Sequence, residues 1–92
     1  MAPAELHGVL TYCAILHGNW VRIDPFANGN GRTARLWANW AALRHGLPPF
    51  VTVKPRPQHP YGAAAAASMA GADEVMLAVM QQMLREYLAG LT

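Results

Sequence analysis

The sequence predicts a small all-α protein, and three observations carry this prediction. Apolar residues recur at helical spacing in three separate stretches of the chain. An alanine-rich segment, residues 63–67, favours helix by propensity. Glycines and prolines stand between these stretches, where they end helices. We therefore expect about four helices in a single domain over residues 1–92.

The first helix is expected over residues 4–19. Pro3 stands where a proline is tolerated in the first turn of a helix. Glu5 follows in the same turn, where a carboxylate suits the positive end of the helix dipole. The apolar residues of this stretch recur every three or four positions and are Leu6, Val9, Leu10, Cys13, Leu16 and Trp20.

A loop is expected from Val21 to Asn28, because the turn formers Asp24-Pro25 and Ala27-Asn28-Gly29 interrupt any helical pattern. A second helix then begins near Gly31, which places the loop between the first two helices. His45-Gly46 predicts its end, since glycine commonly follows the last helical residue. The apolar residues that support this helix are Ala34, Leu36, Trp37, Trp40, Ala41 and Leu43.

Residues 47–60 hold five prolines and predict a surface connection with a short extended stretch at 50–53. A third helix is expected over Tyr61–Ala70, closed by Gly71. Asp73 is expected to cap the last helix. The broad apolar face of that helix comprises Val75, Met76, Val79, Met80, Met83, Leu84, Tyr87, Leu88 and Leu91.

The composition narrows the classes of protein to consider. Hydrophobic residues make up 53% of the chain and charged residues 13%. One small core cannot bury that many apolar side chains. We therefore expect a homo-oligomer, a partner protein or a further segment. The net charge is +2, and the basic residues are scattered along the sequence, which argues against a nucleic-acid-binding protein. No apolar stretch is long enough for a membrane span. The lone Cys13 fits the reducing cytoplasm and a buried apolar role.

The turn Gly29-Asn30-Gly31-Arg32 is the candidate chemical site. Glycines let the backbone approach a ligand, and the helix that follows offers unpaired N–H groups and a positive dipole end. Arg35 lies three residues after Arg32 on the same helical face, so both guanidinium groups can reach one polyphosphate. The alternative is a plain turn followed by solvated arginines, because short glycine motifs recur by chance.

Residues 24–35, read as Asp24-Pro25-Phe26-Ala27-Asn28-Gly29-Asn30-Gly31-Arg32-Thr33-Ala34-Arg35, resemble the signature of the Fic family, H-P-F-x-x-G-N-G-R-x-x-R. Every fixed position matches except the first. The resemblance extends over roughly residues 5–62 and implies the small helical core of a Fic domain. The helices and hairpin flap that normally dock the target of such a domain are expected to be missing from this chain.

The family resemblance implies transfer of AMP from ATP to a Ser, Thr or Tyr hydroxyl of another protein, with Mg²⁺ bridging the phosphates. Some relatives use other nucleotides or phosphate donors. Carried over by position, Gly29-Asn30-Gly31 would cradle the α- and β-phosphates, while Arg32 and Arg35 would hold the departing phosphate tail. Pro25-Phe26 would be structural, with the phenyl ring anchoring the loop in the core. Such a site works by positioning and charge stabilisation.

Two positions depart from the family pattern. Asp24 stands where the family has the histidine that acts as general base, and an aspartate is a weaker base by roughly 2–3 pK units. It would also repel a triphosphate unless Mg²⁺ lies between them. Asn28 stands where many members carry an acidic metal ligand, and its amide is a weaker magnesium ligand. Asp24 thus indicates an impaired site, altered chemistry with the carboxylate on the metal, an engineered change, or merely a turn former before proline.

Most of the remaining histidine, aromatic and basic residues are expected to have structural or solvent-exposed roles. The histidines lack the spacing of a zinc site: they are His7, His17, His45 and His59. His17 is expected to pack or cap near the end of the first helix, although it could approach the loop. Trp20, Trp37 and Trp40 fall at core-like positions. Tyr61 lies either in the core or, as the resemblance implies, near the nucleotide base. Lys54 and Arg56 are expected to be solvated.

The sequence is compatible with two functions from different classes. The first is a Fic-type protein adenylyltransferase weakened by Asp24. The second is a non-catalytic module that binds a nucleotide or a protein through a degenerate site. Many family members are restrained by a helix with a Ser/Thr-x-x-x-Glu-Gly/Asn motif, which this sequence lacks, so an inhibitor would have to be another chain.

Overall fold

The computed structural model describes residues 1–23 and 30–90, and it confirms the all-α fold class. The described residues form helices and connections, with no strand among them. The helices are α1 (Pro3–Ile23), α2 (Asn30–Arg44), α3 (Tyr61–Met69) and α4 (Glu74–Ala89). None of these helices is both long enough and apolar enough to cross a bilayer.

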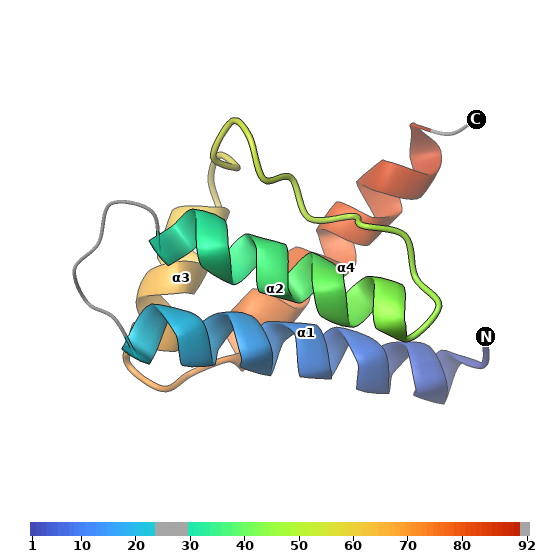
Figure 1. The fold of residues 1–92 in the computed structure, drawn as a ribbon, viewed down its shortest axis with the longest axis horizontal. Helices are drawn as coiled ribbons and strands as arrows, with labels where there is room; N and C mark the ends of the chain where they lie inside the picture. The colour runs from blue at the N-terminus through green and yellow to red at the C-terminus, as the bar shows by residue number, and fades with distance from the viewer. Residues whose placement is uncertain (24–29, 91–92) are drawn as a thin grey trace.

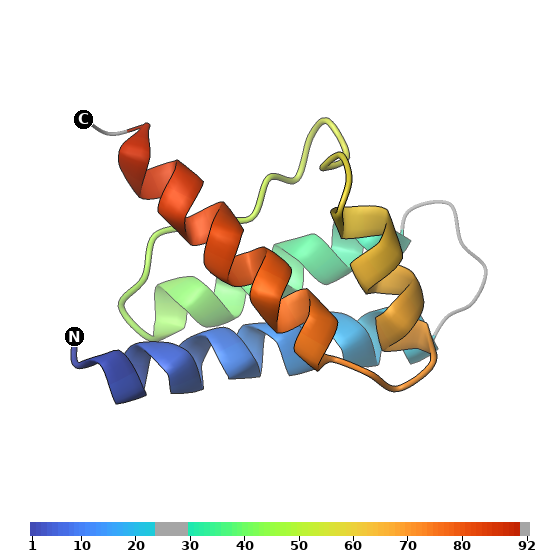
Figure 2. The ribbon, with the colours of Figure 1, turned by 180° about the vertical axis from the view of Figure 1, so that it is seen from behind.

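The helices α1 and α2 lie side by side and run in opposite directions, so the start of α2 returns to the end of α1 (Figure 1). Seen from behind, α4 crosses α1 obliquely and α3 packs at the end of α1 that is nearest the start of α2 (Figure 2). All four helices contribute to one core. Its buried residues include Leu10, Cys13, Ala38, Ala42, Tyr61, Ala64, Met76, Met80 and Leu84.

The helix α1 is longer than predicted. It continues to Ile23, so the expectation of a loop from Val21 is wrong for residues 21–23. The extra turn persists because Val21 is buried and Arg22 binds groups on other elements. Residues 24–28 of the expected loop lie outside the described residues.

Two glycines end helices as predicted. Gly46 has a φ of +87° after α2, and the N–H of Leu47 donates to the carbonyl of Ala42 at 2.8 Å. Gly71 has a φ of +95° after α3, and the N–H of Ala72 donates to the carbonyl of Ala67 at 2.9 Å. Both positions use a left-handed conformation that glycine adopts without steric cost.

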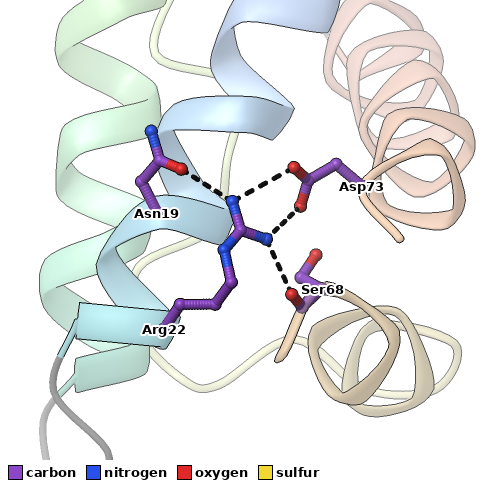
Figure 3. Close-up of polar contacts among 4 residues, drawn as sticks. All are labelled: Asn19, Arg22, Ser68 and Asp73. Carbon is purple, nitrogen blue, oxygen red and sulfur yellow. Dashed lines mark hydrogen bonds and ion pairs between the residues drawn. The ribbon is translucent and has the colours of Figure 1, made fainter. Parts of the chain in front are cut away.

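Asp73 does not cap α4 as predicted. It occupies the N-cap position, but its side chain makes no capping hydrogen bond. Its carboxylate instead pairs with Arg22, whose Nη1 lies 2.9 Å from Oδ1 and whose Nη2 lies 3.3 Å from Oδ2 (Figure 3). A cation offers a carboxylate a stronger hydrogen bond than a backbone N–H does. The ion pair ties the end of α1 to the segment between α3 and α4.

The inner face of α2 reverses the expected pattern. Small side chains are buried there, while Leu36 and Leu43 are more than half exposed. Small residues allow two helices to approach closely, so the bulky residues take the outer face. The buried alanines of α2 are Ala34, Ala38, Ala41 and Ala42.

The three tryptophans, expected at core-like positions as packing residues, pack on one another and are not fully buried. Trp20 and Trp37 are half-buried and stack with centroids 5.5 Å apart, and Trp37 meets Trp40 edge-on at 5.3 Å. Trp40 remains 42% exposed. Large apolar side chains are exposed, as expected, and several of them lie on α1 and α2.

Part of the predicted apolar face of the last helix is buried. It supplies Met76, Val79, Met80 and Leu84 to the core. Val75 and Leu88 from the predicted face are 41% and 48% exposed, and Leu91 lies outside the described residues.

The proline-rich segment 47–60 runs back along α2 toward its start (Figure 1). Asn39, buried in the middle of α2, holds this segment with two hydrogen bonds. Its Nδ2 donates to the carbonyl of Val51 at 2.7 Å, and its Oδ1 accepts from the N–H of Val51 at 2.9 Å. Phe50 and Val51 are buried beside it, so the extended stretch is part of the core.

Candidate active site at the start of α2

Arg35 projects inward from α2 and is only 5% exposed. Its Nη1 donates to the hydroxyl of Tyr61 at 3.2 Å, and its Nη2 donates to the carbonyl of Val53 at 3.1 Å. The hydrogen bonds of Asn39 bring Val53 to this place, because they hold the returning segment against α2. Two elements distant in sequence therefore position one guanidinium.

The guanidinium of Arg35 lies against the first turn of α2. A Cβ placed on Gly31 would lie 3.0 Å from Nη1 of Arg35 and 3.9 Å from the hydroxyl of Tyr61. A side chain at position 31 would therefore press on the guanidinium, and glycine is what permits the close approach. The first turn of a helix also carries unpaired N–H groups and a positive dipole end. Gly31, Arg35 and Tyr61 thus converge at one helix start.

Tyr61 links this site to α1. It is 1% exposed, and its hydroxyl lies 2.6 Å from Nε2 of the fully buried His17. The two rings meet edge-on with centroids 5.4 Å apart, and the guanidinium carbon of Arg35 lies 5.2 Å from the tyrosine centroid. The expectation that His17 packs near the end of the first helix is confirmed.

Burial lowers the pKa of His17 to about 4, and the charge of Arg35 adds to this effect, while Asp73 opposes it. His17 is therefore a neutral imidazole at neutral pH. Burial also raises the pKa of the Cys13 thiol to about 11, which keeps that side chain an apolar part of the core as expected.

The positive charge of Arg35 is not balanced by any described carboxylate. The salt bridge recorded in the described part of the chain joins Arg22 to Asp73. Arg35 is held by a phenol and a carbonyl, and its buried Nε has no hydrogen-bond partner among the residues that the structure describes. A buried cation with neutral acceptors and unused donors has a strong demand for an anion.

Arg32 stands on the first turn of α2, one turn before Arg35, and is exposed. The two arginines of the motif therefore differ in environment although their spacing places them on neighbouring positions of one helix face. One is available to solvent and the other is fixed in the interior.

Several residues of the sequence motif lie outside the described residues. They are Asp24, Pro25, Phe26, Asn28 and Gly29. Asn30 begins α2, and its side chain is likewise outside what is described. Among the residues that are described, no group of three His, Cys, Asp or Glu side chains could hold a metal ion. The magnesium ligands expected at Asp24 and Asn28 therefore stay predictions.

Sequence reasoning missed three contributors to this region. Asn39 fixes the returning segment, and its signal was a polar residue among alanines on the inner side of a helix. Arg22 anchors the end of α1, in a stretch that was expected to be a loop. Arg56, expected to be solvated, is exposed but has its guanidinium carbon 5.8 Å from the ring of Tyr61.

The fold and this site define a small all-α protein with a buried arginine at the start of a helix. Residues 3–42 match the sequence model of the Fic/DOC family. This segment, which holds α1, the motif and most of α2, is similar to members of that family. The resemblance predicted from the motif is thereby confirmed over these residues.

Individual relatives match a similar share of the chain. A uridine 5'-monophosphate transferase of Xanthomonas campestris pv. campestris (strain 8004) is 52% identical over 42 residues, which is 46% of this chain and 8% of that protein. Proteins named protein adenylyltransferase Fic from Drosophila virilis and Drosophila melanogaster are 45% identical over 51 residues, which is 55% of this chain and 10% of theirs. The chain thus spans about a tenth of the length of these relatives. No solved structure matches it.

Proposed function

We propose that this chain is the core of a Fic-type protein adenylyltransferase, which transfers AMP from ATP to a hydroxyl of a target protein and is weakened by Asp24. The observation that carries the proposal is the buried guanidinium of Arg35 at the start of α2, which pairs with no carboxylate in the described part of the chain. Similarity to the Fic/DOC family over residues 3–42 supports the class of reaction. The target would offer a Ser, Thr or Tyr side chain.

In this proposal the phosphates of ATP lie over the first turn of α2. The backbone N–H groups there would bind the α- and β-phosphates together with Gly29 and Asn30. Arg32 would approach the phosphate tail from solvent, and Arg35 would hold it from the interior. Their charges would stabilise pyrophosphate as it leaves, while the target oxygen bonds to the α-phosphorus. A bound Mg²⁺ would supply further charge neutralisation between the phosphates.

Asp24 would then stand near the incoming hydroxyl in place of a histidine. Its carboxylate is a poor base at neutral pH and adds negative charge beside the phosphates. We expect transfer to be slower by roughly 10²–10⁴-fold than with histidine, the usual contribution of a general base.

The test is a titration of Mg²⁺-ATP into the chain and into its Asp24→His variant, followed by transfer of labelled AMP to candidate target proteins. UTP in place of ATP tests the choice of nucleotide, because one relative is named for uridine monophosphate. Both proteins are expected to bind nucleotide, Arg32→Ala to weaken binding, and Asp24→His to raise transfer. Absence of nucleotide binding by both proteins would overturn the proposal.

A second candidate is a non-catalytic module that binds a partner protein. The exposed apolar residues on α1 and α2 favour it, since Ile23, Leu36, Trp40 and Leu43 are all at least 42% exposed. This function predicts a homo-oligomer or a complex that survives Arg32→Ala. A monomeric mass at micromolar concentration would count against the homo-oligomer, and loss of a complex in Arg32→Ala would count against the module.

A further inference from the structure

The hydroxyl of Tyr61 is shared between two buried groups. It accepts a hydrogen bond from Nη1 of Arg35 at 3.2 Å and lies 2.6 Å from Nε2 of His17. All three side chains are at least nine-tenths buried, so water competes little for these contacts. The three residues come from α1, α2 and α3, which meet here.

The donors and acceptors favour one direction for this chain of hydrogen bonds. A neutral imidazole has one N–H and one acceptor nitrogen. If Nε2 of His17 accepts the proton of the Tyr61 hydroxyl, then Arg35 donates to Tyr61 and Tyr61 donates to His17. Of the described imidazole and phenol groups, this leaves Nδ1–H of His17 unpaired. The opposite tautomer would leave both the phenol proton and the Nδ1 lone pair unpaired. The first arrangement satisfies more buried groups.

We propose that Tyr61 and His17 are positioning residues for Arg35, holding its guanidinium against Gly31 so that its remaining donors face the start of α2. This inference rests on the proposed function only for what Arg35 binds. Holding the guanidinium in advance spares the entropy of ordering a long, flexible side chain when the anion arrives. The neutral imidazole leaves the full positive charge of Arg35 available to that anion.

The first experiment observes Arg35 without any nucleotide. Slow rotation of a clamped guanidinium gives separate NMR signals for its Nη protons, whereas a free one gives averaged signals. We expect separate signals for Arg35 in the chain and averaged signals in Tyr61→Phe, which keeps the ring and removes only the hydroxyl. Tyr12→Phe, on the exposed Tyr12, is the matched control and should leave the signals separate. Separate signals in Tyr61→Phe would overturn the proposal.

The second experiment measures Mg²⁺-ATP affinity in a double-mutant cycle. Tyr61→Phe should weaken binding about tenfold in the chain but by less than about twofold in Arg35→Ala, because it acts through Arg35. His17→Phe should also weaken binding, and adding it to Tyr61→Phe should have little further effect. An equal loss from Tyr61→Phe in both backgrounds would overturn the positioning role, since Tyr61 would then touch the nucleotide itself.

The two proposals fail in different ways. If the chain and Asp24→His bind no nucleotide, the proposed function is overturned while the Arg35 signals still decide the positioning role. If nucleotide binds, Arg35→Ala weakens binding and Tyr61→Phe does not, the positioning role is overturned and the proposed function stands.

Discussion

Arg22, just before the motif, and Arg35, its last residue, lie in opposite environments. Arg22, in the last turn of α1, is partly exposed and pairs with the carboxylate of Asp73 at 2.9 Å. It also donates to the carbonyl of Ser68 at 2.7 Å and to Oδ1 of Asn19 at 2.6 Å (Figure 3). Arg35, near the start of α2, is buried and is held by a phenol and a carbonyl. One charge is paired with a carboxylate, and the other has no carboxylate partner among residues 1–23 and 30–90.

The difference separates a structural cation from a candidate ligand-binding one. A partly exposed ion pair with several acceptors has no need of a ligand, and its loss costs stability alone. A buried cation without a described counter-ion costs stability in the free protein and gains most when an anion arrives. The environment of each arginine, and not its residue type, therefore indicates its role.

Replacing each arginine by methionine tests this difference most directly, and the largest effect is expected here. Arg35→Met removes the unpaired charge and fills the space, so we expect Mg²⁺-ATP affinity to fall roughly 100- to 1000-fold while the free energy of unfolding stays level or rises by about 1 kcal/mol. Arg22→Met should leave the affinity within about twofold and lower the free energy of unfolding by about 1 kcal/mol. Calorimetric titration and urea unfolding measure both. Equal effects of the two changes on both quantities would erase the distinction.

The pKa of His17 depends on the surroundings of both arginines. Burial lowers this pKa most, Arg35 lowers it further, and Asp73, the partner of Arg22, raises it. The folded pKa of about 4 lies below the usual 6.5. Between those values the unfolded chain binds a proton that the folded chain does not, so stability should be full above pH 6.5 and fall as the pH drops toward 4. Protonation of this residue should lower the free energy of unfolding by about 3 kcal/mol as the pH falls from 6.5 to 4.

Urea unfolding at several pH values checks this, with His17→Phe as the variant whose slope should flatten. NMR titration of the ring sharpens it, since Arg35→Met should raise the pKa of His17 and Asp73→Asn should lower it further. A ring that titrates near pH 6.5 would contradict the buried, neutral state.

The smallest effect concerns the close packing beside the Arg22 ion pair. A Cβ on Gly18 would overlap the carboxylate of Asp73, whereas a Cβ on Gly8, in the same helix, meets nothing within 4 Å. Gly8→Ala should raise the free energy of unfolding by roughly 0.5–1 kcal/mol through helix propensity. Gly18→Ala should lower it by about 1 kcal/mol, because the ion pair must shift. Thermal unfolding compares the two, and equal stabilisation by both would show that the ion pair adapts freely.

The sequence was informative where a local pattern has one physical meaning. Apolar spacing predicted the helices, and Gly46 and Gly71 predicted where two of them end, since few residues adopt a left-handed conformation. The motif from Asp24 to Arg35 predicted the family, which the match over residues 3–42 confirms. The roles assigned to the motif residues stay predictions.

Local patterns failed where two partners compete for one group. Asp73 was expected to cap α4, but a distant arginine offered its carboxylate a stronger bond. The large apolar residues of α2 were expected to face inward, but the buried apolar residues described in this helix are alanines, which allow close contact with α1. In both cases the competing partner is more than ten residues away, so no window of sequence contains the comparison.

What this sequence determined by itself is the helical class, the helix stops and the family motif, because these depend on neighbours within one or two turns. Only the tertiary structure decided that Arg35 is buried, that the Tyr61 hydroxyl contacts both Arg35 and His17, and that Arg22 pairs with Asp73. The charge state and orientation of a side chain depend on which groups surround it in space. Those groups are brought together by the packing of α1 against α2, α3 and α4.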